Sequence, residues 1–297
     1  MLLNRKQFDV LSILAESSSF LSQRKIGALA KMSIGSVNRV IDDLKAAGLY
    51  DGTSVTPAGF EALEPYRVKR AVILAAGFGD RLMPITLNTP KPLIRVNGKR
   101  IIDTMLDGLI QKGIHEIYIV RGYRKEQFDQ LLYKYPDLHF VDNDDYRETN
   151  NISSILKVKD YLENVYVLEG DLILKNPDLI RRYEYESNYL GVPVERTDDW
   201  CFMVNHKKII TGVVVGGLNC FHMYGISFWN EEDGKKLAKH IPEVWEAPGG
   251  KERFWDLVPL QYHADEYSVH VRECSFDDIV EIDTFNELAA LDPAYSI

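Results

Sequence analysis

Residues 70–96 read RAVILAAGFGDRLMPITLNTPKPLIRV, and they combine a strand with the elements of a phosphate-binding site. Ala71–Leu74 is a short apolar run of the kind that forms a buried parallel strand. It leads into Ala75–Gly79, where small residues leave backbone N–H groups uncovered and able to surround an anion. Arg81 and Lys91 follow, and Lys91 lies between two prolines that restrict its backbone. A bare loop followed by two cations is suited to binding a nucleoside triphosphate.

The glycines of this loop match neither of two common phosphate-binding patterns. Gly-x-x-x-x-Gly-Lys-Ser/Thr and Gly-x-Gly-x-x-Gly are both absent from the stretch. The longer string Leu-Ala-Ala-Gly-x-Gly-x-Arg-Leu-x-Pro, followed by Thr-Pro-Lys-Pro-Leu, is far more specific. It resembles the signature of nucleotidyltransferases, which join a nucleoside triphosphate to a phosphorylated small molecule. The alternative interpretation is an ordinary strand-to-helix turn.

Length and composition indicate a soluble globular protein of two domains. The 297 residues carry a net charge of −9, which argues against nucleic-acid binding by the whole chain. The three cysteines have no metal-ligand spacing, so we expect free thiols in a reducing cytoplasm. No apolar run is long enough to span a membrane, and the N-terminal residues lack the layout of a signal peptide.

Residues 1–66 are predicted to form a small helical domain. Apolar side chains recur at helical spacing in three segments, and Ser22 and Ser33 are candidate N-caps. Asp51-Gly52 is typical of the turn of a short hairpin. Three helices and a hairpin, with the later phrase Val-Thr-Pro-Ala-Gly-Phe-Glu-Ala-Leu, resemble a winged helix-turn-helix of the MarR type.

The resemblance to a winged helix leaves the role of this domain open. In a DNA-binding winged helix, residues 22–56 would form the DNA-binding surface, with Ser36, Asn38 and Arg39 nearest the bases. Residues 1–67 contain eight Lys and Arg against seven Asp and Glu, which is a weak positive charge for that task. A structural or partner-binding appendage is the alternative.

From residue 67 to 297 apolar strands alternate with helical stretches, and this part is predicted to be one α/β domain. The alternation implies a Rossmann-like fold with a mixed, mainly parallel sheet covered on both faces. Ligands of such sheets bind at the carboxyl ends of the strands. The predicted strands are Ala71–Leu74, Ile117–Val120, Leu138–Val141 and Val165–Leu168, and the predicted helices are Ile101–Lys112, Lys125–Tyr133 and Ile155–Leu162.

Two carboxylates in this domain are candidate metal ligands. Asp171 follows the apolar strand Val165–Leu168, at the edge where the Gly-rich loop ends. Glu281 and Asp283 lie two residues apart, on one face of a strand by period two. Carboxylates at such an edge can hold Mg²⁺ against a triphosphate, so Asp171 and Asp283 are the predicted metal pair. As the alternative, Asp283 caps the helix that follows it.

Together with the Gly-rich segment and the candidate metal ligands, further residues make the stretch 68–292 resemble the bacterial CTP:phosphocholine cytidylyltransferases. The Gln-x-x-Pro-x-Gly-x-Ala pattern of sugar nucleotidyltransferases is missing, because residues 148–154 read ETNNISS. Residues 169–172 read EGDL, where the choline enzymes read more like DADN, so the aspartate is kept and its neighbours differ. The supporting residues are Gly113, Ile114, Ile117, Gly122, Tyr123, Lys125, Glu126, Gln127, Phe128, Asn150, Asn151, Ser154, Gly225–Trp229, Trp255, Asp256 and Glu281–Asp283.

Aromatic residues of the second half are candidates for binding a quaternary ammonium, which is attracted to ring faces. Trp200 and Trp255 stand beside acids in the sequence, an unusual position for an apolar core residue, and Tyr224 is a weaker third candidate. Asp256 and Glu281 would add negative charge. The alternative is that most of these rings belong to the core.

The resemblance implies that CMP is transferred from CTP to phosphocholine, with Lys91, Arg81 and Asp171 as catalytic residues and Mg²⁺ as cofactor. The alternative acceptors are a sugar 1-phosphate or another phospho-amino alcohol, and a nucleotide-sensing transcription regulator is a third reading. A homodimer is left open. The implied nucleotide-binding residues are Leu74, Ala75, Ala76, Gly77, Phe78, Gly79, Arg81, Lys91, Gly122, Tyr123, Asn150, Asn151 and Ser154.

Overall fold

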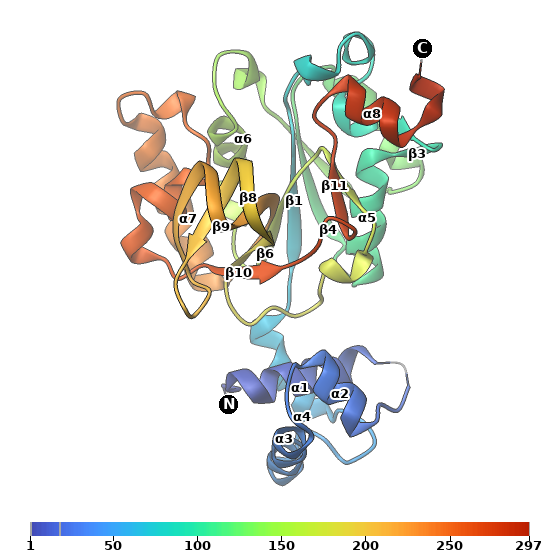
Figure 1. Ribbon diagram of the computed structural model, residues 1–297, viewed down its shortest axis with the longest axis vertical. Coiled ribbons are helices and arrows are strands. Elements are labelled where there is room, and N and C mark those ends of the chain that lie inside the picture. Colours follow the sequence, from blue (N-terminus) through green and yellow to red (C-terminus); the bar gives the residue numbers. More distant parts are fainter. Residues whose placement is uncertain (1, 18, 297) are drawn as a thin grey trace. The chain divides into compact units, whose positions relative to one another are not determined.

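The computed structural model describes residues 2–17 and 19–296, and the chain divides into two compact units (Figure 1). The helical unit comprises Met1–Arg67 together with Arg182–Tyr185, and the sheet unit comprises Val68–Arg181 and Glu186–Ile297. The sequence boundary was predicted between residues 66 and 67. No sequence signal indicated that the short segment Arg182–Tyr185 belongs with the first unit.

The helical unit contains four short helices whose beginnings follow from their capping residues. The predicted N-caps Ser22 and Ser33 are confirmed, since their hydroxyls accept hydrogen bonds from Lys25 N and Ser36 N at 3.3 and 3.2 Å. The helices are α1 (Arg5–Glu16), α2 (Gln23–Leu29), α3 (Ile34–Ala46), α4 (Pro57–Leu63) and the 3₁₀ turn η1 (Glu64–Tyr66).

A single β-bridge between Tyr50 and Val55 stands where the hairpin was predicted. Asp51 shapes the turn between them by accepting hydrogen bonds from the backbone N–H groups of Thr53 and Ser54, both at 2.7 Å. Tyr185 completes the core of the unit, because its ring stacks on that of Tyr66 with the centroids 5.4 Å apart. The assignment of this unit to the winged helices stays a prediction.

The sheet unit is a seven-stranded, mixed sheet in the order β10-β8-β9-β6-β1-β4-β5. Four neighbouring strands, β6, β1, β4 and β5, are parallel, and β9 runs antiparallel to β6. All four predicted strands are confirmed within one residue at each end. The strands are β1 (Arg70–Ala75), β4 (Glu116–Arg121), β5 (Leu138–Asp142), β6 (Val165–Glu169), β8 (Asn188–Val204), β9 (Ile210–Trp229) and β10 (His270–Glu273).

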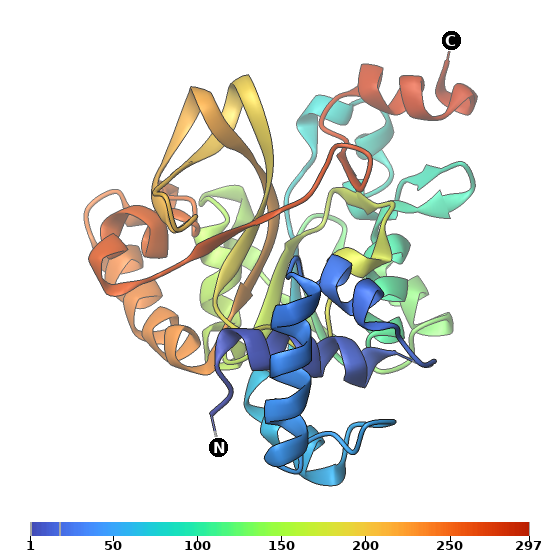
Figure 2. The ribbon, with the colours of Figure 1, turned by 60° about the horizontal axis from the view of Figure 1, so that its bottom comes forward.

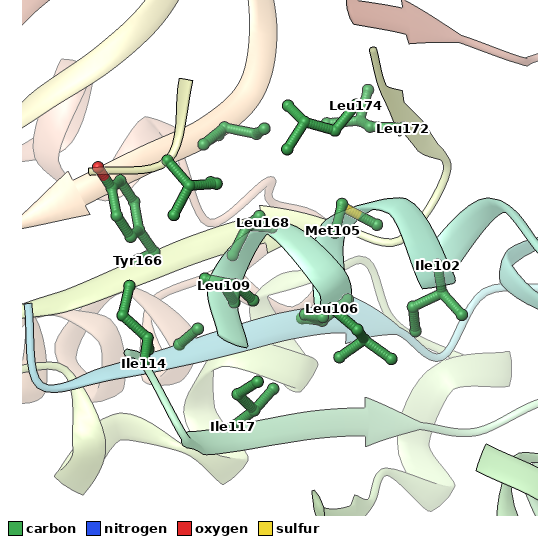
Figure 3. Close-up of a cluster of buried hydrophobic side chains, with 14 of the residues drawn as sticks. Ile102, Met105, Leu106, Leu109, Ile114, Ile117, Tyr166, Leu168, Leu172 and Leu174 are labelled. Carbon is green, nitrogen blue, oxygen red and sulfur yellow. The ribbon is translucent and has the colours of Figure 1, made fainter. Parts of the chain in front are cut away.

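Strand β1 lies at the centre of the unit because it is apolar on both faces. Ala71 and Ile73 point into a core with helix α5 (Ile101–Gln111), while Val72 and Leu74 point into a core on the other face. The second core is formed with α6 (Ile152–Lys157) and α7 (Glu231–Glu246). Figure 3 shows the first core, in which Ile102, Leu106 and Leu109 of α5 cover the sheet. This arrangement is the predicted Rossmann-like α/β fold.

The predicted helices differ in two details from those observed. Lys125–Tyr133 is a 3₁₀ helix, η5, and the stretch predicted as Ile155–Leu162 is divided between α6 and the 3₁₀ turn η7 (Lys159–Tyr161). The remaining 3₁₀ turns are η2 (Asp80–Leu82), η3 (Ile85–Leu87), η4 (Lys91–Leu93), η6 (Asp144–Arg147), η8 (Pro177–Leu179), η9 (Gly250–Glu252), η11 (Ala264–Glu266) and η12 (Pro293–Tyr295), and η10 (Val258–Tyr262) is a π-helix.

Two further features of the sheet unit position the functional residues. Strands β8 and β9 form a long twisted ribbon that extends beyond the sheet (Figure 2). Helix α8 (Phe285–Leu291) packs through Leu288 against Leu82 and Ile94, which brings the chain near residue 283 to the Gly-rich segment.

The small sheets are β11 (Ile279–Glu281) with β7 (Leu172–Leu174), and β2 (Arg95–Val96) with β3 (Lys99–Arg100). Across residues 2–17 and 19–296, no helix is long and apolar enough to cross a membrane.

Candidate active site

A cavity of about 600 Å³ opens at the carboxyl ends of β1 and β6 in the sheet unit. This is the edge at which ligands of parallel sheets bind. It is large enough for a nucleotide and a small acceptor. The predicted site residues that line it are Leu74, Ala75, Ala76, Gly77, Gly79, Arg81, Lys91, Asn150, Asn151, Ser154, Asp171, Trp200, Asp256, Glu281 and Asp283.

The Gly-rich loop has the backbone that an anion nest requires. Gly79 has a φ of +69°, in the left-handed region that favours glycine, and its carbonyl accepts a hydrogen bond from Thr86 Oγ1 at 3.0 Å. A Cβ at Gly77 would meet no protein atom within 4 Å, so the space beside this backbone faces the cavity. The loop is therefore held from one side and open on the other.

Lys91 links the two predicted metal ligands. Its Nζ lies 2.8 Å from Asp171 Oδ2 and 2.9 Å from Asp283 Oδ1, and Arg81 Nη2 lies 2.8 Å from the same Asp283 oxygen. Burial alone would lower the pKa of Lys91, but the two carboxylates outweigh that effect and raise it, so the side chain stays charged. The predicted phosphate-binding cations and the predicted metal ligands thus neutralise one another.

The donor set around Asp171 fits a hard divalent cation. Asp171 Oδ1 is buried and has no hydrogen-bond partner, which is a costly state unless another group approaches it. Carboxylate oxygens of Glu169, Asp171 and Glu281 lie within 4.8 Å of one another. Oxygen donors at this spacing are those that Mg²⁺ prefers.

Three further acids around the cavity are strongly perturbed. Burial, reinforced by the charges of Asp171 and Asp283, raises the pKa of Glu281 to about 8, and burial raises that of Asp256 to about 6. Burial and the neighbouring carboxylates also raise the pKa of Glu169 well above its ordinary value. Gly225 makes room for Glu169, since a Cβ there would lie 2.5 Å from its carboxylate oxygen. Glu169 was not predicted as a site residue.

Trp200 is the one predicted aromatic residue that lines the cavity within the described part of the chain. Its ring meets that of Phe254 edge to face, with the centroids 5.6 Å apart. Asp199 lies beside it on the same lining. Together the two rings and the carboxylate form a corner of the cavity that is both aromatic and negatively charged.

Trp255 and Tyr224, which were predicted to bind the acceptor, are buried and do not line this cavity. Trp255 is 1% exposed and packs between Tyr189 and Trp229, with centroids at 6.3 and 5.8 Å. Tyr224 is 4% exposed, and its hydroxyl donates to Ile279 O at 3.3 Å. An acid next in sequence does not draw a ring towards solvent, because successive side chains point in different directions. Asp256, the neighbour of Trp255, accepts a hydrogen bond from Tyr189 instead of leaving the interior.

Phe78, Gly122 and Tyr123 also lie outside the described lining of the cavity. They support the Gly-rich loop from behind, because Tyr123 N donates to Ala76 O at 3.0 Å and Tyr123 Oη to Thr86 O at 2.8 Å. The Phe78 ring packs on Tyr123 and Tyr146, with both pairs of centroids 5.1 Å apart. These residues position the loop and do not face the ligand space.

The amide pair Asn150 and Asn151 joins two segments that are distant in the chain. Asn151 Oδ1 accepts from Trp255 N at 2.9 Å, and Asn150 N donates to Lys251 O at 2.8 Å. Asn143 Nδ2 donates to Ser154 Oγ at 3.0 Å on the same side of the cavity. Hydrogen bonds therefore hold Asn150, Asn151 and Ser154, which were predicted to contact the nucleotide, in place along the cavity.

Sequence reasoning missed Glu169, Asp199, Tyr146 and Phe254, all of which line the cavity. Glu169 carried a usable signal, since a carboxylate at the last position of an otherwise apolar strand is unusual. Asp199 lies on the β8–β9 ribbon, Phe254 on the segment after α7 and Tyr146 on η6, so they come together only in the fold. No local pattern marks them.

Comparisons with known proteins agree with this geometry. Residues 70–191 match the nucleotidyl transferase family model. The chain is 36% identical over 228 residues to a 2-aminoethylphosphonate cytidylyltransferase of Lancefieldella rimae, covering 76% of this chain and 92% of the relative. It is 34% identical to a choline-phosphate cytidylyltransferase of Streptococcus pneumoniae, covering 75% and 96%.

A solved structure shows the same fold. The CTP:phosphocholine cytidylyltransferase of Streptococcus pneumoniae superposes with a TM-score of 0.71 at 34% identity, covering 77% of this chain and 99% of that one. Relatives of this identity, matched over nearly their whole length, share family membership as well as fold. The chain therefore belongs to the nucleotidyltransferase family, among its CTP-using cytidylyltransferases.

Proposed function

We propose that the protein transfers CMP from CTP to a small acceptor that carries a phosphate or phosphonate at one end and an ammonium group at the other. The observation that carries this proposal is the composition of one cavity. Two cations and a bare loop line one part of it, and the neighbouring carboxylates of Glu169 and Glu281, within 4.8 Å of a carboxylate oxygen of Asp171, have no hydrogen-bond or ion-pair partner among the described residues. Such a cavity complements a triphosphate and a cationic acceptor at once.

The reaction is an in-line displacement. An anionic oxygen of the acceptor attacks the α-phosphorus of CTP, and the bond from that phosphorus to the bridging oxygen of the β-phosphate breaks as pyrophosphate leaves. No protein base is needed, because the attacking oxygen is already ionised at neutral pH. Arg81 and the loop hold the β- and γ-phosphates, while Lys91 neutralises charge at the α-phosphate.

Asp171 and Asp283 would hold Mg²⁺, for which the unpartnered Asp171 Oδ1 is the supporting observation. When bound, the ion supplies charge neutralisation and alignment of the two phosphorus-bearing reactants. CTP binding would then draw Lys91 and Arg81 towards the phosphates and free the two aspartates. The ion pairs seen in the structure keep this charge balanced until the nucleotide arrives.

A primary ammonium suits the acceptor end better than a quaternary one. A primary ammonium donates three hydrogen bonds, and unpartnered carboxylates such as those of Glu169 and Glu281 need donors. A trimethylammonium donates none and relies on ring faces, of which Trp200 and Phe254 supply two. The proposed acceptor is thus 2-aminoethylphosphonate, the substrate named for the Lancefieldella rimae relative.

Phosphocholine, which the sequence resemblance implies, is the second candidate. The observation in its favour is the Trp200–Phe254 corner beside Asp199, a small aromatic and acidic site of the kind that binds methylated ammonium groups. The alternative of a regulator without turnover is not favoured, because Arg81, Lys91, Asp171 and Asp283 meet in one place.

The test is pyrophosphate release over a grid of four nucleoside triphosphates and four acceptors: 2-aminoethylphosphonate, phosphoethanolamine, phosphocholine and glucose 1-phosphate. We expect CTP with 2-aminoethylphosphonate to give the highest kcat/KM. A preference for phosphocholine of about tenfold or more would overturn the primary-ammonium assignment and retain the cytidylyltransferase. Release with the sugar phosphate alone would overturn the cationic acceptor.

For the helical unit we propose the winged-helix fold, on the order of α1, α2, α3, the Tyr50–Val55 bridge and α4. We also propose a cytoplasmic location, in keeping with the free thiols of Cys201, Cys220 and Cys274.

The role of the helical unit is tested by selecting, from random duplex DNA, the sequences that the full chain binds. Salt-sensitive enrichment of one sequence by the full chain would assign it to DNA, and no enrichment would assign it a structural or partner-binding role.

A further inference from the structure

A second cluster of ligating side chains lies in the sheet unit, away from the acids of the cavity. His240 comes from the C-terminal half of α7, and His263 and Glu266 come from the turn that follows η10. The ligating atoms of the three residues lie within 4.8 Å of one another. None of the three lines the cavity described above.

One carboxylate faces a nitrogen of each imidazole. Glu266 Oε1 lies 3.1 Å from His263 Nδ1, and Glu266 Oε2 lies 3.5 Å from His240 Nε2. The two rings are nearly parallel, at 4°, with their centroids 3.8 Å apart. Two histidines and one carboxylate therefore point at a common region from two different segments of the chain.

His240 is held in the orientation that a metal ligand needs. The side chain is 2% exposed, and its Nδ1 is hydrogen-bonded to the hydroxyl of Tyr267 at 2.9 Å. That contact engages one ring nitrogen and directs Nε2, the other, towards Glu266. Metal-binding histidines in proteins are commonly oriented by a second hydrogen bond of this kind.

The other two members can move enough to close around an ion. Ligand atoms of a tetrahedral zinc site are roughly 3.3 Å apart, which follows from metal–ligand distances of about 2 Å. His263 and Glu266 are 21% and 48% exposed, so small side-chain rotations would bring them in and an ion could enter from solvent. Glu243, whose carboxylate is 3.8 Å from His263 Nε2, is available as a further oxygen donor.

We propose that His240, His263 and Glu266 form a binding site for a zinc-type transition-metal ion that fastens α7 to the turn carrying His263. Imidazole nitrogen with one carboxylate is a donor set for Zn²⁺, and Mg²⁺ prefers oxygen donors. The positive side chains around the cluster are already engaged. Lys236 is paired with Glu232 and Asp233, and Lys239 lies 3.8 Å from Glu243.

The experiment uses the full, tag-free chain after removal of metal by a chelator. Zn²⁺ is titrated by calorimetry in excess Mg²⁺, which fills the carboxylates of the cavity without competing for nitrogen donors. Co²⁺ is then added as a spectroscopic probe, because its visible absorption reports nitrogen coordination. The variants are His263→Ala and Glu266→Gln, with His206→Ala as the control, since His206 is exposed and lies outside the cluster.

We expect one Zn²⁺ per chain at micromolar or tighter Kd, weakened about 30-fold or more in His263→Ala and about tenfold in Glu266→Gln. His206→Ala should bind like the parent chain. Zn²⁺ should raise the Tm of the parent chain and raise that of His263→Ala by less. Equal affinity in His263→Ala and the parent, or no binding above the Mg²⁺ background, would overturn the site. Circular dichroism of the metal-free variants confirms that they are folded.

Discussion

The nucleotide end and the acceptor end of the cavity are built from the chain in opposite ways. The nucleotide end takes its loop and both cations from residues 74–91, one continuous segment, and adds Asp171 and Asp283. The acceptor end takes Glu169, Trp200, Phe254 and Glu281 from four segments spread over more than a hundred residues. A local motif can announce the first kind of site, and only the fold assembles the second.

The two ends also differ in how their charges are balanced. At the nucleotide end, Lys91 and Arg81 are paired with Asp171 and Asp283. At the acceptor end, burial and the neighbouring carboxylates of Asp171 and Asp283 raise the pKa of Glu281 to about 8. The charges of the first end are balanced without a ligand. The second end is suited to bind a ligand that carries positive charge. Substitutions at the two ends should therefore affect different kinetic constants.

Lys91→Met tests the nucleotide end most directly. Losing the cation at the α-phosphate should lower kcat by about 10³-fold with the fold intact, as judged by circular dichroism. Lys175→Met is the matched control, because Lys175 is an exposed lysine of the same unit. Turnover in Lys91→Met within tenfold of the parent would remove Lys91 from the chemistry.

Asp171→Asn tests the metal at the same end. The amide keeps the size of the side chain but removes the charge that Mg²⁺ binds, so we expect kcat/KM to fall about 10²-fold or more and the Mg²⁺ concentration for half-maximal rate to rise. Steady-state rates over a Mg²⁺ titration measure both. An unchanged Mg²⁺ requirement would argue that the ion binds elsewhere.

Substitutions of Trp200 and Trp255 should distinguish a tryptophan that lines the cavity from one that belongs to the core. Trp255→Ala should lower the free energy of unfolding by about 3–5 kcal/mol, because it removes a large buried ring. Trp200→Ala should leave stability within about 1 kcal/mol and raise the KM of the acceptor. Urea unfolding and acceptor kinetics on both variants distinguish these roles. A stable Trp255→Ala with a high acceptor KM would reverse the assignment.

Glu281→Gln tests whether this carboxylate binds the ammonium group of the acceptor. Loss of a carboxylate that a bound ammonium would keep ionised should raise the KM of an ammonium-bearing acceptor about 10- to 100-fold, with the KM of CTP within about threefold of the parent. Glu246→Gln, an exposed acid of the same unit, is the control. Equal losses for CTP and acceptor would show that Glu281 serves both ends of the cavity.

Asp256→Asn should have the smallest effect, on stability and its pH dependence. Burial raises the pKa of Asp256 to about 6, so its protonated form favours the folded state, and this contribution is present at acid pH and lost as the pH rises from about 4 to about 6. The free energy of unfolding of the variant, relative to that of the parent, should therefore rise by about 2 kcal/mol over that pH range. Chemical unfolding at pH 4.5 and pH 8 measures the difference. A constant difference would show that Asp256 does not titrate there.

Much of the sheet was predictable because it is local in origin. The four apolar runs are strands, and the small residues after Leu74 form the expected loop. The acceptor end was predicted less well, since adjacency to an acid in sequence placed Trp255 in the cavity, whereas its ring lies in the core. The position of a side chain around a ribbon depends on packing, and a neighbour in sequence does not reveal it.

By itself the sequence determined the reaction class, because the Gly-rich loop, Arg81 and Lys91 lie on one short segment with a specific spacing. Tertiary structure decided which acids and rings line the part of the cavity where we propose that the acceptor binds. Glu169 ends one strand, Trp200 lies on the β8–β9 ribbon, and Glu281 ends β11, so these side chains meet only once the sheet has formed. Contacts between distant segments leave no local pattern, so only the fold shows which side chains line this part of the cavity.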